Sequence, residues 1–188
     1  MASGNGSNAQ RIMEYFSGHP WIRVEMVLSN NPQAYVLKRA KTFNIPTLTF
    51  DRHTFYHTNQ ILDILSVQSI DWIILAGFLW LIPGHLLDFY PNHILNIHPA
   101  LLPKYGGKGM YGQKVHQEVI KNGDQISGIT IHFVNEKYDD GQIIFQSKCQ
   151  VSPEETAETL AGKIHSLEYR WFPEIIEQTL NHHPSSSL

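Results

Sequence analysis

Two polar side chains suited to carbonyl chemistry, Asn96 and His98, lie two residues apart in the segment N-I-H-P-A-L-L-P. The apolar residues around them predict a strand over Ile94–His98. Alternate side chains of a strand share a face, so both point the same way at its carboxyl end, where open α/β sheets bind ligands. An amide beside an imidazole supplies an oxyanion donor and a proton carrier, which carbonyl transfer to an amine needs. A histidine that only packs at a strand end is the alternative.

Two neighbouring carboxylates, Asp139 and Asp140, precede Gly141 in the segment V-N-E-K-Y-D-D-G. Asp-Gly pairs are common in tight turns, so a purely structural role is one interpretation. A functional role requires one carboxylate close to His98. There it would favour the imidazolium, raise the pKa of His98 and keep this histidine competent as an acid.

The segment S-G-N-G-S-N at residues 3–8 leads into a stretch of helical character, Ala9–Phe16. Small residues at a helix N-terminus let backbone amides and the helix dipole act on an anion, so the segment is either a phosphate loop or a merely flexible terminus. Such a loop normally follows a buried strand, yet two residues precede Ser3. We therefore expect either a recorded sequence that starts late or a sheet that lacks one strand, with Val24–Leu28 partly unpaired.

Short apolar runs alternate with longer amphipathic stretches, a pattern typical of the α/β class, with parallel strands joined by helical crossovers. The connection N-E-K-Y-D-D-G is too short for a crossover helix, so the last two strands should be antiparallel. The predicted strands are Val24–Leu28, Pro46–Thr49, Trp72–Ala76, Ile94–His98, Gly128–Val134 and Gln142–Val151, and the helices between them are Pro32–Thr42, Asn59–Gln68 and Gly112–Lys121.

A last helix is predicted from Pro153 to about Leu180, with Ser152 as its cap and with Pro173 kinking or dividing it. The polar tail, residues 181–188, has no periodicity and is expected to be frayed. Neither a repeat nor a shift in composition divides the chain, so residues 1–188 are predicted to form a single domain.

Composition argues against several classes of partner. The net charge is −3 and the Lys and Arg residues are scattered, which disfavours nucleic acid. The longest apolar run, Trp72–Ile82, is shorter than the about 20 residues that span a membrane. A single cysteine, Cys149, and a start without the features of a secretory signal predict a cytoplasmic protein.

The histidines other than His98 show no metal-binding spacing. The sequence contains neither H-E-x-x-H nor C-x-x-C, so no metal is expected. His132 in a predicted strand and His165 in a predicted helix are assigned to packing or hydrogen bonding. His116, in the helix after a glycine-rich loop, is compatible with either role.

The combination N-x-H-P-A-L-L-P with a later D-x-G resembles the folate-dependent formyltransferases over nearly the whole chain. The resemblance implies a Rossmann-like, mostly parallel twisted sheet flanked by helices, with an antiparallel C-terminal strand pair. The segment S-G-N-G-S-N is similar to the phosphate loop of those members that formylate glycinamide ribonucleotide in purine synthesis. Relatives that formylate an aminoacyl-tRNA or hydrolyse the formyl donor share N-x-H-P but not this loop. The implied formyl donor is 10-formyltetrahydrofolate, and the implied acceptor is the glycyl amine.

The same resemblance implies roles for individual residues. Asn96 and His98 match the catalytic pair, and Asp139 matches the carboxylate that interacts with the histidine. In the implied mechanism the amine attacks the formyl carbon while Asn96 and protonated His98 stabilise the oxyanion. Gly6, Ser7 and Asn8 match the phosphate-binding segment, Glu168 matches a glutamate near the glycyl amine, and the residues implied to contact folate are Arg52, Leu79, Trp80, Leu81, Ile82, Asn96 and Tyr138.

Two rival functions remain open from the sequence. One is hydrolysis of formyltetrahydrofolate, with water in place of the amine. The other is a catalytically silent protein that binds a phosphosugar or folate on the same fold. Retention of Asn96, His98 and Asp139 together argues against the silent protein, which has no need of all three. The chain is expected to be a monomer or a homodimer.

Overall fold

Helices and strands alternate along residues 1–182, the part of the chain that the computed structural model describes. Every strand and helix predicted above is present, and two helices of six residues each, α3 and α5, are additional because they are too short to show a periodicity. The elements are α1 (Ser7–Tyr15), β1 (Val27–Ser29), α2 (Tyr35–Thr42), β2 (Thr47–Thr49), α3 (Arg52–His57), α4 (Gln60–Val67), β3 (Ile73–Leu75), α5 (Gly84–Phe89), β4 (Ile94–His98), α6 (Gln113–Lys121), β5 (Ile126–Phe133), β6 (Ile143–Gln150) and α7 (Ala157–His182).

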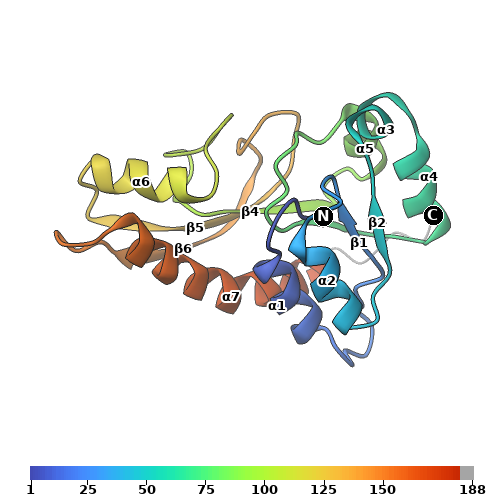
Figure 1. The fold of residues 1–188 in the computed structure, drawn as a ribbon, viewed down its shortest axis with the longest axis horizontal. Coiled ribbons are helices and arrows are strands. Elements are labelled where there is room, and N and C mark those ends of the chain that lie inside the picture. The colour runs from blue at the N-terminus through green and yellow to red at the C-terminus, as the bar shows by residue number, and fades with distance from the viewer. Residues whose placement is uncertain (183–188) are drawn as a thin grey trace.

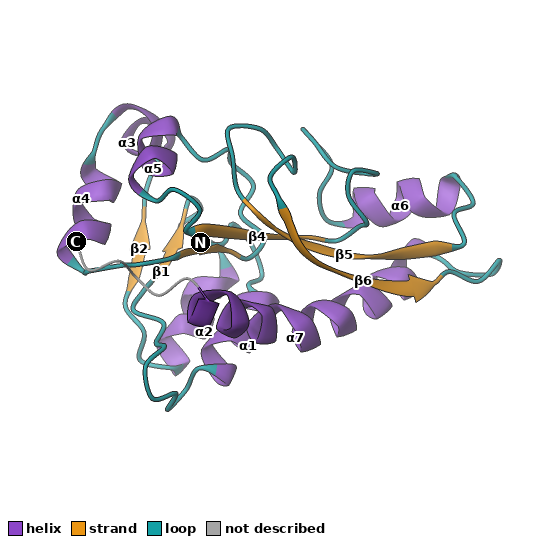
Figure 2. Cartoon of the chain, turned by 180° about the vertical axis from the view of Figure 1, so that it is seen from behind, coloured by secondary structure: helices purple, strands orange, loops and turns teal. Residues whose placement is uncertain are grey.

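The strands form two sheets that run through the middle of the molecule (Figures 1 and 2). Strands β1 and β2 are parallel, and the larger sheet has the order β3-β4-β5-β6. Within it β3 and β4 are parallel, whereas β4–β5 and β5–β6 are antiparallel. The predicted antiparallel C-terminal pair is therefore confirmed, and antiparallel pairing begins one strand earlier, at β4.

Residues 1–3 join the two sheets through backbone hydrogen bonds. The Ala2 amide donates to the Leu28 carbonyl at 3.0 Å, and the Ala76 amide donates to the Met1 carbonyl at 2.9 Å. Only a short stub thus lies between β1 and β3. The expectation that Val24–Leu28 is partly unpaired is confirmed, because β1 begins at Val27 and residues 24–26 are in no strand.

Helix α7 runs along the larger sheet and carries much of the core (Figure 1). Its predicted start at Pro153 is wrong: the helix begins at Ala157, because the hydroxyl of Thr156 accepts from the Thr159 amide at 3.2 Å. Pro173 does not divide the helix, since buried side chains on both sides of it pack against the sheet. The helix ends at His182, so residues 181–182 are not frayed, and the rest of the predicted tail lies outside the described residues.

The remaining helices divide between the two ends of the molecule. Helices α3, α4 and α5 gather at the end of β1 and β2, whereas α6 lies at the opposite end and packs against α7 (Figures 1 and 2). Helix α1 packs against both α2 and α7. Within residues 1–182, no helix has the length and apolar character needed to span a membrane.

Candidate active site

The side chain of Asn96 is held by a histidine on the neighbouring strand. Asn96 on β4 is directly opposite His132 on β5, and its Nδ2 lies 3.1 Å from His132 Nε2. His132 Nδ1 lies 2.7 Å from the Phe133 carbonyl, which can only accept. The proton therefore sits on Nδ1, and Nε2 accepts from the Asn96 amide. This orientation leaves the second N–H of the Asn96 amide for a ligand oxygen.

The imidazole of His98 lies at the end of β4 between a backbone carbonyl and a carboxylate. Its Nε2 is 2.7 Å from the Tyr105 carbonyl, to which it must donate, and its Nδ1 is 3.5 Å from Asp139 Oδ2. His98 itself is only 3% exposed. A proton on Nδ1 would thus lie against the carboxylate, so His98 and Asp139 form a pair that can take up and release one proton.

Burial controls the protonation state of His98. Desolvation lowers the pKa of His98 below its usual value, and the Asp139 carboxylate and the Tyr105 carbonyl oppose this effect without reversing it. Asp139 thus acts in the expected direction, but the expectation that the pKa of His98 is raised overall is wrong. At neutral pH the imidazole is uncharged and able to accept a proton.

The two aspartates of the β5–β6 loop have different surroundings. Asp139 Oδ2 accepts from the Gly107 amide at 2.9 Å, and Oδ1 lies 3.8 Å from His132 Nε2. Asp140 instead points outward, with its side chain 56% exposed and 3.6 Å from Lys137. The geometry thus selects Asp139, which sequence spacing alone could not distinguish from Asp140.

The N-terminal loop has the geometry of an anion site. Gly6 has a left-handed backbone with φ 74°, and a Cβ there would lie 2.3 Å from Val36. No side chain caps the first turn of α1, where Ser7 and Asn8 begin the helix. Their amides are therefore available to a ligand, and the helix dipole favours a negative one. Arg39 fixes the loop by donating to the Asn5 carbonyl at 2.9 Å.

A buried carboxylate on α7 connects to this loop. Glu168 is 6% exposed, and its Oε2 accepts from Asn8 Nδ2 at 2.9 Å. Burial raises the pKa of Glu168 to about 7, with the Asn8 hydrogen bond opposing the shift. Near neutral pH this carboxyl group can therefore exchange a proton next to the anion loop.

Glu168 should make the stability of the free protein depend on pH. Its folded pKa of about 7 exceeds the ordinary value of 4.5, so between these values the native state binds more protons than the unfolded state. The free energy of unfolding therefore falls as the pH rises through 7, by about 3 kcal/mol from this group. We expect Glu168→Gln to remove this part of the decline between pH 5 and pH 8, measured by urea unfolding. Glu158→Gln, on the exposed first turn of the same helix, should leave it unchanged.

Arg52, one of the residues expected to contact folate, lies beside two aromatic rings. The guanidinium of Arg52 lies 5.0 Å from the Tyr56 ring centre and 5.6 Å from that of Trp80. Tyr56 also donates to the Leu81 carbonyl at 3.0 Å. The structure thus brings Arg52 to the segment 79–82, in which Ile82 is buried and Leu79 is 43% exposed, while Tyr138 is 37% exposed.

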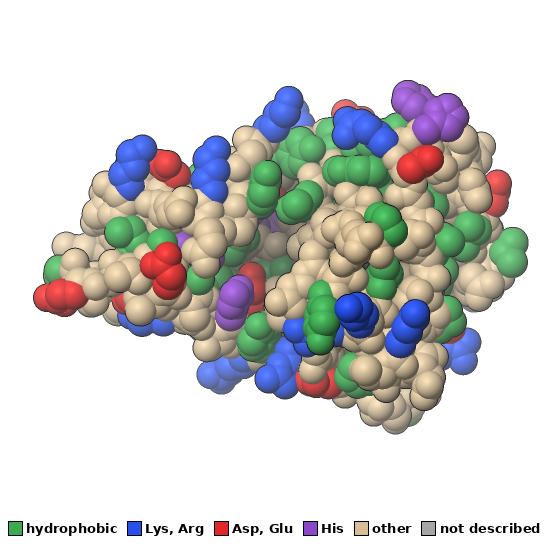
Figure 3. Space-filling view, in the orientation of Figure 1, with side chains coloured by type: hydrophobic (Ala, Val, Ile, Leu, Met, Phe, Trp, Pro, Cys, Tyr) green, Lys and Arg blue, Asp and Glu red, His purple; other side chains and the backbone are tan. Residues whose placement is uncertain are grey.

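A shallow hollow lies near the middle of one face, between the end that carries α6 and the end that carries α3 and α5 (Figure 3). Hydrophobic side chains border it, and the Lys and Arg side chains on this face are dispersed. Within residues 1–182, no group of three or more His, Cys, Asp and Glu side chains could hold a metal ion.

The structure adds to what the sequence indicated for two further histidines, His132 and His116. His132 was assigned to packing or hydrogen bonding, and it forms a hydrogen bond with Asn96 and approaches Asp139. The sequence did not show that its partner is Asn96, which lies opposite it on an antiparallel strand. His116 is 3% exposed, and its Nδ1 has no hydrogen-bond partner within residues 1–182. Burial, followed by the nearby His165 and His98, lowers the pKa of His116 to about 4.

The fold and these side chains define a class: an α/β protein whose amide, imidazole and carboxylate groups suit carbonyl chemistry and whose uncapped helix terminus suits an anion. A family model described as formyl transferase matches residues 1–176. The chain therefore belongs to the formyl transferase family, as its sequence motifs predicted.

Relatives and solved structures narrow the family assignment. The chain is 35% identical to phosphoribosylglycinamide formyltransferase of Bacillus subtilis, over 95% of this chain and 92% of the relative. It is 39% identical to the chloroplastic enzyme of the same name from Arabidopsis thaliana, over 93% of this chain and 62% of that protein. The crystal structure of phosphoribosylglycinamide formyltransferase from Bacillus halodurans superimposes with a TM-score of 0.86 at 31% identity, covering 98% of this chain and 95% of that one.

Proposed function

We propose that this enzyme transfers the formyl group of 10-formyltetrahydrofolate to the glycyl amine of glycinamide ribonucleotide, a step of purine synthesis. The observation that carries the proposal is the pairing of Asn96 and His98–Asp139 with an uncapped, glycine-flanked helix terminus in one chain. The side chains of Asn96, His98 and Asp139 suit acyl transfer, and the helix terminus suits a phosphate. Relatives with the corresponding name cover nearly the whole chain.

The substrate phosphate would lie on the amides of Ser7 and Asn8, and the glycyl amine near Glu168. The buried carboxyl group of Glu168, with its pKa raised to about 7, can accept a proton from the glycyl ammonium group and leave the neutral amine that attacks. Folate would lie along the segment 79–82, with Arg52 available for a carboxylate of the folate.

The neutral amine then attacks the formyl carbon, and the carbonyl oxygen becomes an oxyanion. The free N–H of Asn96 donates to this oxygen. Negative charge there raises the affinity of His98 for a proton, so the imidazole that is neutral in the free enzyme takes a proton from the attacking nitrogen. The C–N bond to folate breaks as that proton reaches the departing nitrogen. Overall, the glycyl ammonium group and 10-formyltetrahydrofolate give the formamide, tetrahydrofolate and one released proton.

Release of tetrahydrofolate, followed by absorbance, tests the proposal directly. We expect release from 10-formyltetrahydrofolate to depend on added glycinamide ribonucleotide. Release at the same rate without the ribonucleotide would identify a hydrolase, and binding of both ligands without release would identify a silent binding protein. Either result would contradict the proposal.

Substitution of Gly6 tests the role of the anion loop. We expect Gly6→Ala to raise KM for glycinamide ribonucleotide about tenfold with little change in kcat, because a Cβ would displace Val36 and the left-handed backbone costs about 1–2 kcal/mol for alanine. Gly4→Ala is the matched control, since a Cβ at Gly4 meets no atom within 4 Å. An unchanged KM in Gly6→Ala, or an equal effect of both substitutions, would contradict this role.

The cytoplasmic location, the single domain and the monomeric or homodimeric state stay predictions. Light scattering coupled to size-exclusion chromatography distinguishes the two oligomeric states. The free thiol of Cys149 is compatible with a reducing compartment.

A further inference from the structure

The segment that follows β4 contacts both members of the His98–Asp139 pair. The Tyr105 carbonyl accepts from His98 Nε2 at 2.7 Å, and two residues later the Gly107 amide donates to Asp139 Oδ2 at 2.9 Å. Residues 105–107 therefore hold the imidazole by an acceptor and the carboxylate by a donor. The relative position of the two side chains depends on where this short segment lies.

The backbone of this segment has a conformation that a tyrosine does not favour. The φ angle of Tyr105 is 58°, in the left-handed region that is unfavourable for a residue with a Cβ. The next residue is closely packed, because a Cβ at Gly106 would lie 2.6 Å from the Leu102 side chain and 3.2 Å from Asp139 Cβ. A backbone conformation of this kind persists only where surrounding contacts hold it.

The hydroxyl group of Tyr105 supplies such contacts on the connection between α6 and β5. It donates to Asp124 Oδ2 at 3.0 Å and accepts from Asn122 Nδ2 at 3.0 Å. Lys104 also donates to Asp124 Oδ2, at 3.1 Å, and the Tyr105 ring packs against the core below the larger sheet. The side chain of Tyr105 is thus fixed outside the site, while its carbonyl points into the site.

The Tyr105 carbonyl decides which nitrogen of His98 carries the proton in the neutral ring. A carbonyl can only accept, so Nε2 is protonated and Nδ1, which faces Asp139 at 3.5 Å, is not. Without this carbonyl the proton would be free to move to Nδ1, where Asp139 would accept a hydrogen bond from it. A ring protonated on Nδ1 has no lone pair there to take a proton from the attacking amine.

We propose that Tyr105 is a positioning residue for formyl transfer. Its hydroxyl group, held by Asp124 and Asn122, aims its carbonyl at His98 and so keeps Nδ1 of the imidazole as the proton acceptor. This inference rests on the proposed function, because it assigns a role in the proton transfer that the His98–Asp139 pair performs there. Tyr105 acts through His98 and does not touch the substrates.

The groups around His98 make the contribution of this carbonyl measurable. Asp139 faces the ring from the β5–β6 loop, His132 from β5 and His116 from α6. Desolvation lowers the pKa of His98 most, the Asp139 carboxylate and then the Tyr105 carbonyl raise it, and His132 lowers it further. Loss of the Tyr105 contact should therefore lower the pKa of His98, in the same direction as loss of the Asp139 carboxylate but by less.

Nitrogen NMR of the histidine rings tests the position of the proton without any substrate. We expect the neutral ring of His98 to carry its proton on Nε2 in the original protein, and a population protonated on Nδ1 to appear in Tyr105→Phe. The spectrum of His98→Ala identifies the resonances of this ring. A proton on Nδ1 in the original protein, or the same proton position in both proteins, would overturn the proposal.

Kinetics of Tyr105→Phe test the consequence for catalysis, because this change keeps the ring and removes only the hydroxyl group. We expect kcat to fall about tenfold, KM for glycinamide ribonucleotide to stay within about twofold, and the acidic limb of kcat/KM to move to lower pH. Tyr111→Phe is the matched control, since Tyr111 is 54% exposed in the same glycine-rich segment. Equal losses in the two variants, or a loss in Tyr105→Phe without the shift of the acidic limb, would overturn the positioning role.

Substitutions of Asp124 test the same contact from its other end and replace Tyr105→Phe if thermal melting shows that this variant is unfolded. Asp124→Ala should lower kcat as Tyr105→Phe does, whereas Asp124→Asn keeps an oxygen for the hydroxyl group and should retain most of the activity. The double variant with Tyr105→Phe and Asp124→Ala should lose no more than the larger single loss, because both changes break one contact. Additive losses, or equal losses in Asp124→Asn and Asp124→Ala, would overturn the role of this contact. Tetrahydrofolate release that does not depend on the ribonucleotide would overturn the proposed function and leave the NMR result standing.

Discussion

Replacement of His98 by alanine should lower kcat by about 100- to 1000-fold, the effect typical of removing one group that stabilises an oxyanion. His98 accounts for both the proton transfer and part of the charge stabilisation, and its Nδ1 faces Asp139 at 3.5 Å. KM for glycinamide ribonucleotide should change less than kcat, because the phosphate is expected to bind on the first turn of α1. Steady-state kinetics of tetrahydrofolate release separate the two parameters.

Two controls distinguish chemistry from folding in this variant. The alanine substitution leaves a space beside the Tyr105 carbonyl, so added imidazole should restore part of the activity. Thermal unfolding shows whether the site has collapsed. Near-normal kcat in a folded His98→Ala protein would remove His98 from the mechanism.

The local part of the site could be predicted from the sequence. Asn96 and His98 share a face of one strand, which the alternation of β structure alone requires, and the strand has the predicted bounds. The turn before α1 was also local, since glycine and small residues precede the helix directly. Features that depend on neighbouring residues along the chain are those that sequence patterns record.

The parts that depend on strand register could not be predicted. His132 reaches Asn96 only because β5 is antiparallel to β4 with these two residues opposite each other. The pKa of His98 depends on burial by segments far along the chain, so a carboxylate was expected to raise it and desolvation instead lowers it. The start of α7 was also mispredicted. Ser152 and Pro153 indicated a start at Pro153, whereas Thr156 caps the helix in the structure.

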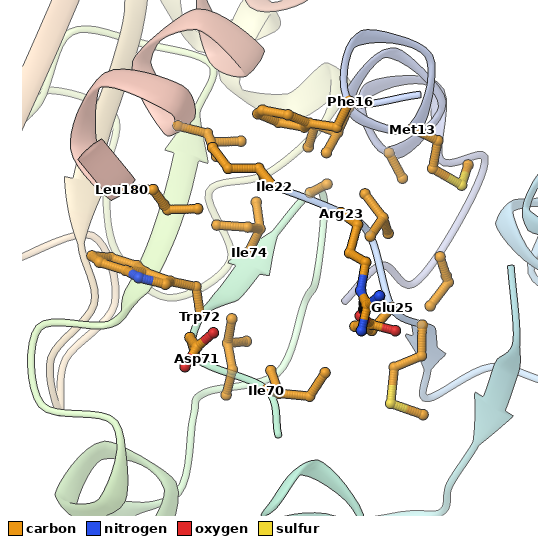
Figure 4. Close-up of a pocket in the computed structure, with 18 of the residues that line it drawn as sticks. Met13, Phe16, Ile22, Arg23, Glu25, Ile70, Asp71, Trp72, Ile74 and Leu180 are labelled. Carbon is orange, nitrogen blue, oxygen red and sulfur yellow. Dashed lines mark hydrogen bonds and ion pairs between the residues drawn. The ribbon is translucent and has the colours of Figure 1, made fainter. Parts of the chain in front are cut away.

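The region between β1 and β3 combines one feature that the sequence predicted with one that it did not. The spacing before residues 3–8 predicted either a late start of the recorded sequence or a sheet that lacks one strand, and within the described residues the backbone of residues 1–3 bridges β1 and β3. What the sequence could not show is that the edges of β1 and β3 remain apart beside a cavity of about 780 Å³ (Figure 4). Helices α1 and α7, which line it, hold the walls in place through contacts remote in sequence.

Asp139→Asn should lower kcat on the order of 1000-fold, somewhat less than the about 10,000-fold loss for the corresponding change in a buried Ser-His-Asp triad. Asparagine keeps an oxygen for the Gly107 amide but can no longer stabilise a proton on His98 Nδ1. Because the carboxylate raises the pKa of His98 against desolvation, its loss lowers that pKa further. An acidic limb in kcat/KM that reports His98 should therefore move to lower pH in the variant.

Asp140→Asn is the matched control for this change. The two residues are adjacent and chemically identical, but Asp140 is exposed and pairs with Lys137, so its substitution should leave kcat within about twofold of the original. A loss of folding in the loop would affect both variants, whereas a loss of proton transfer affects Asp139→Asn alone. Equal losses in the two variants would mean that the loop acts through its conformation, and the role of Asp139 as the partner of His98 would have to be abandoned.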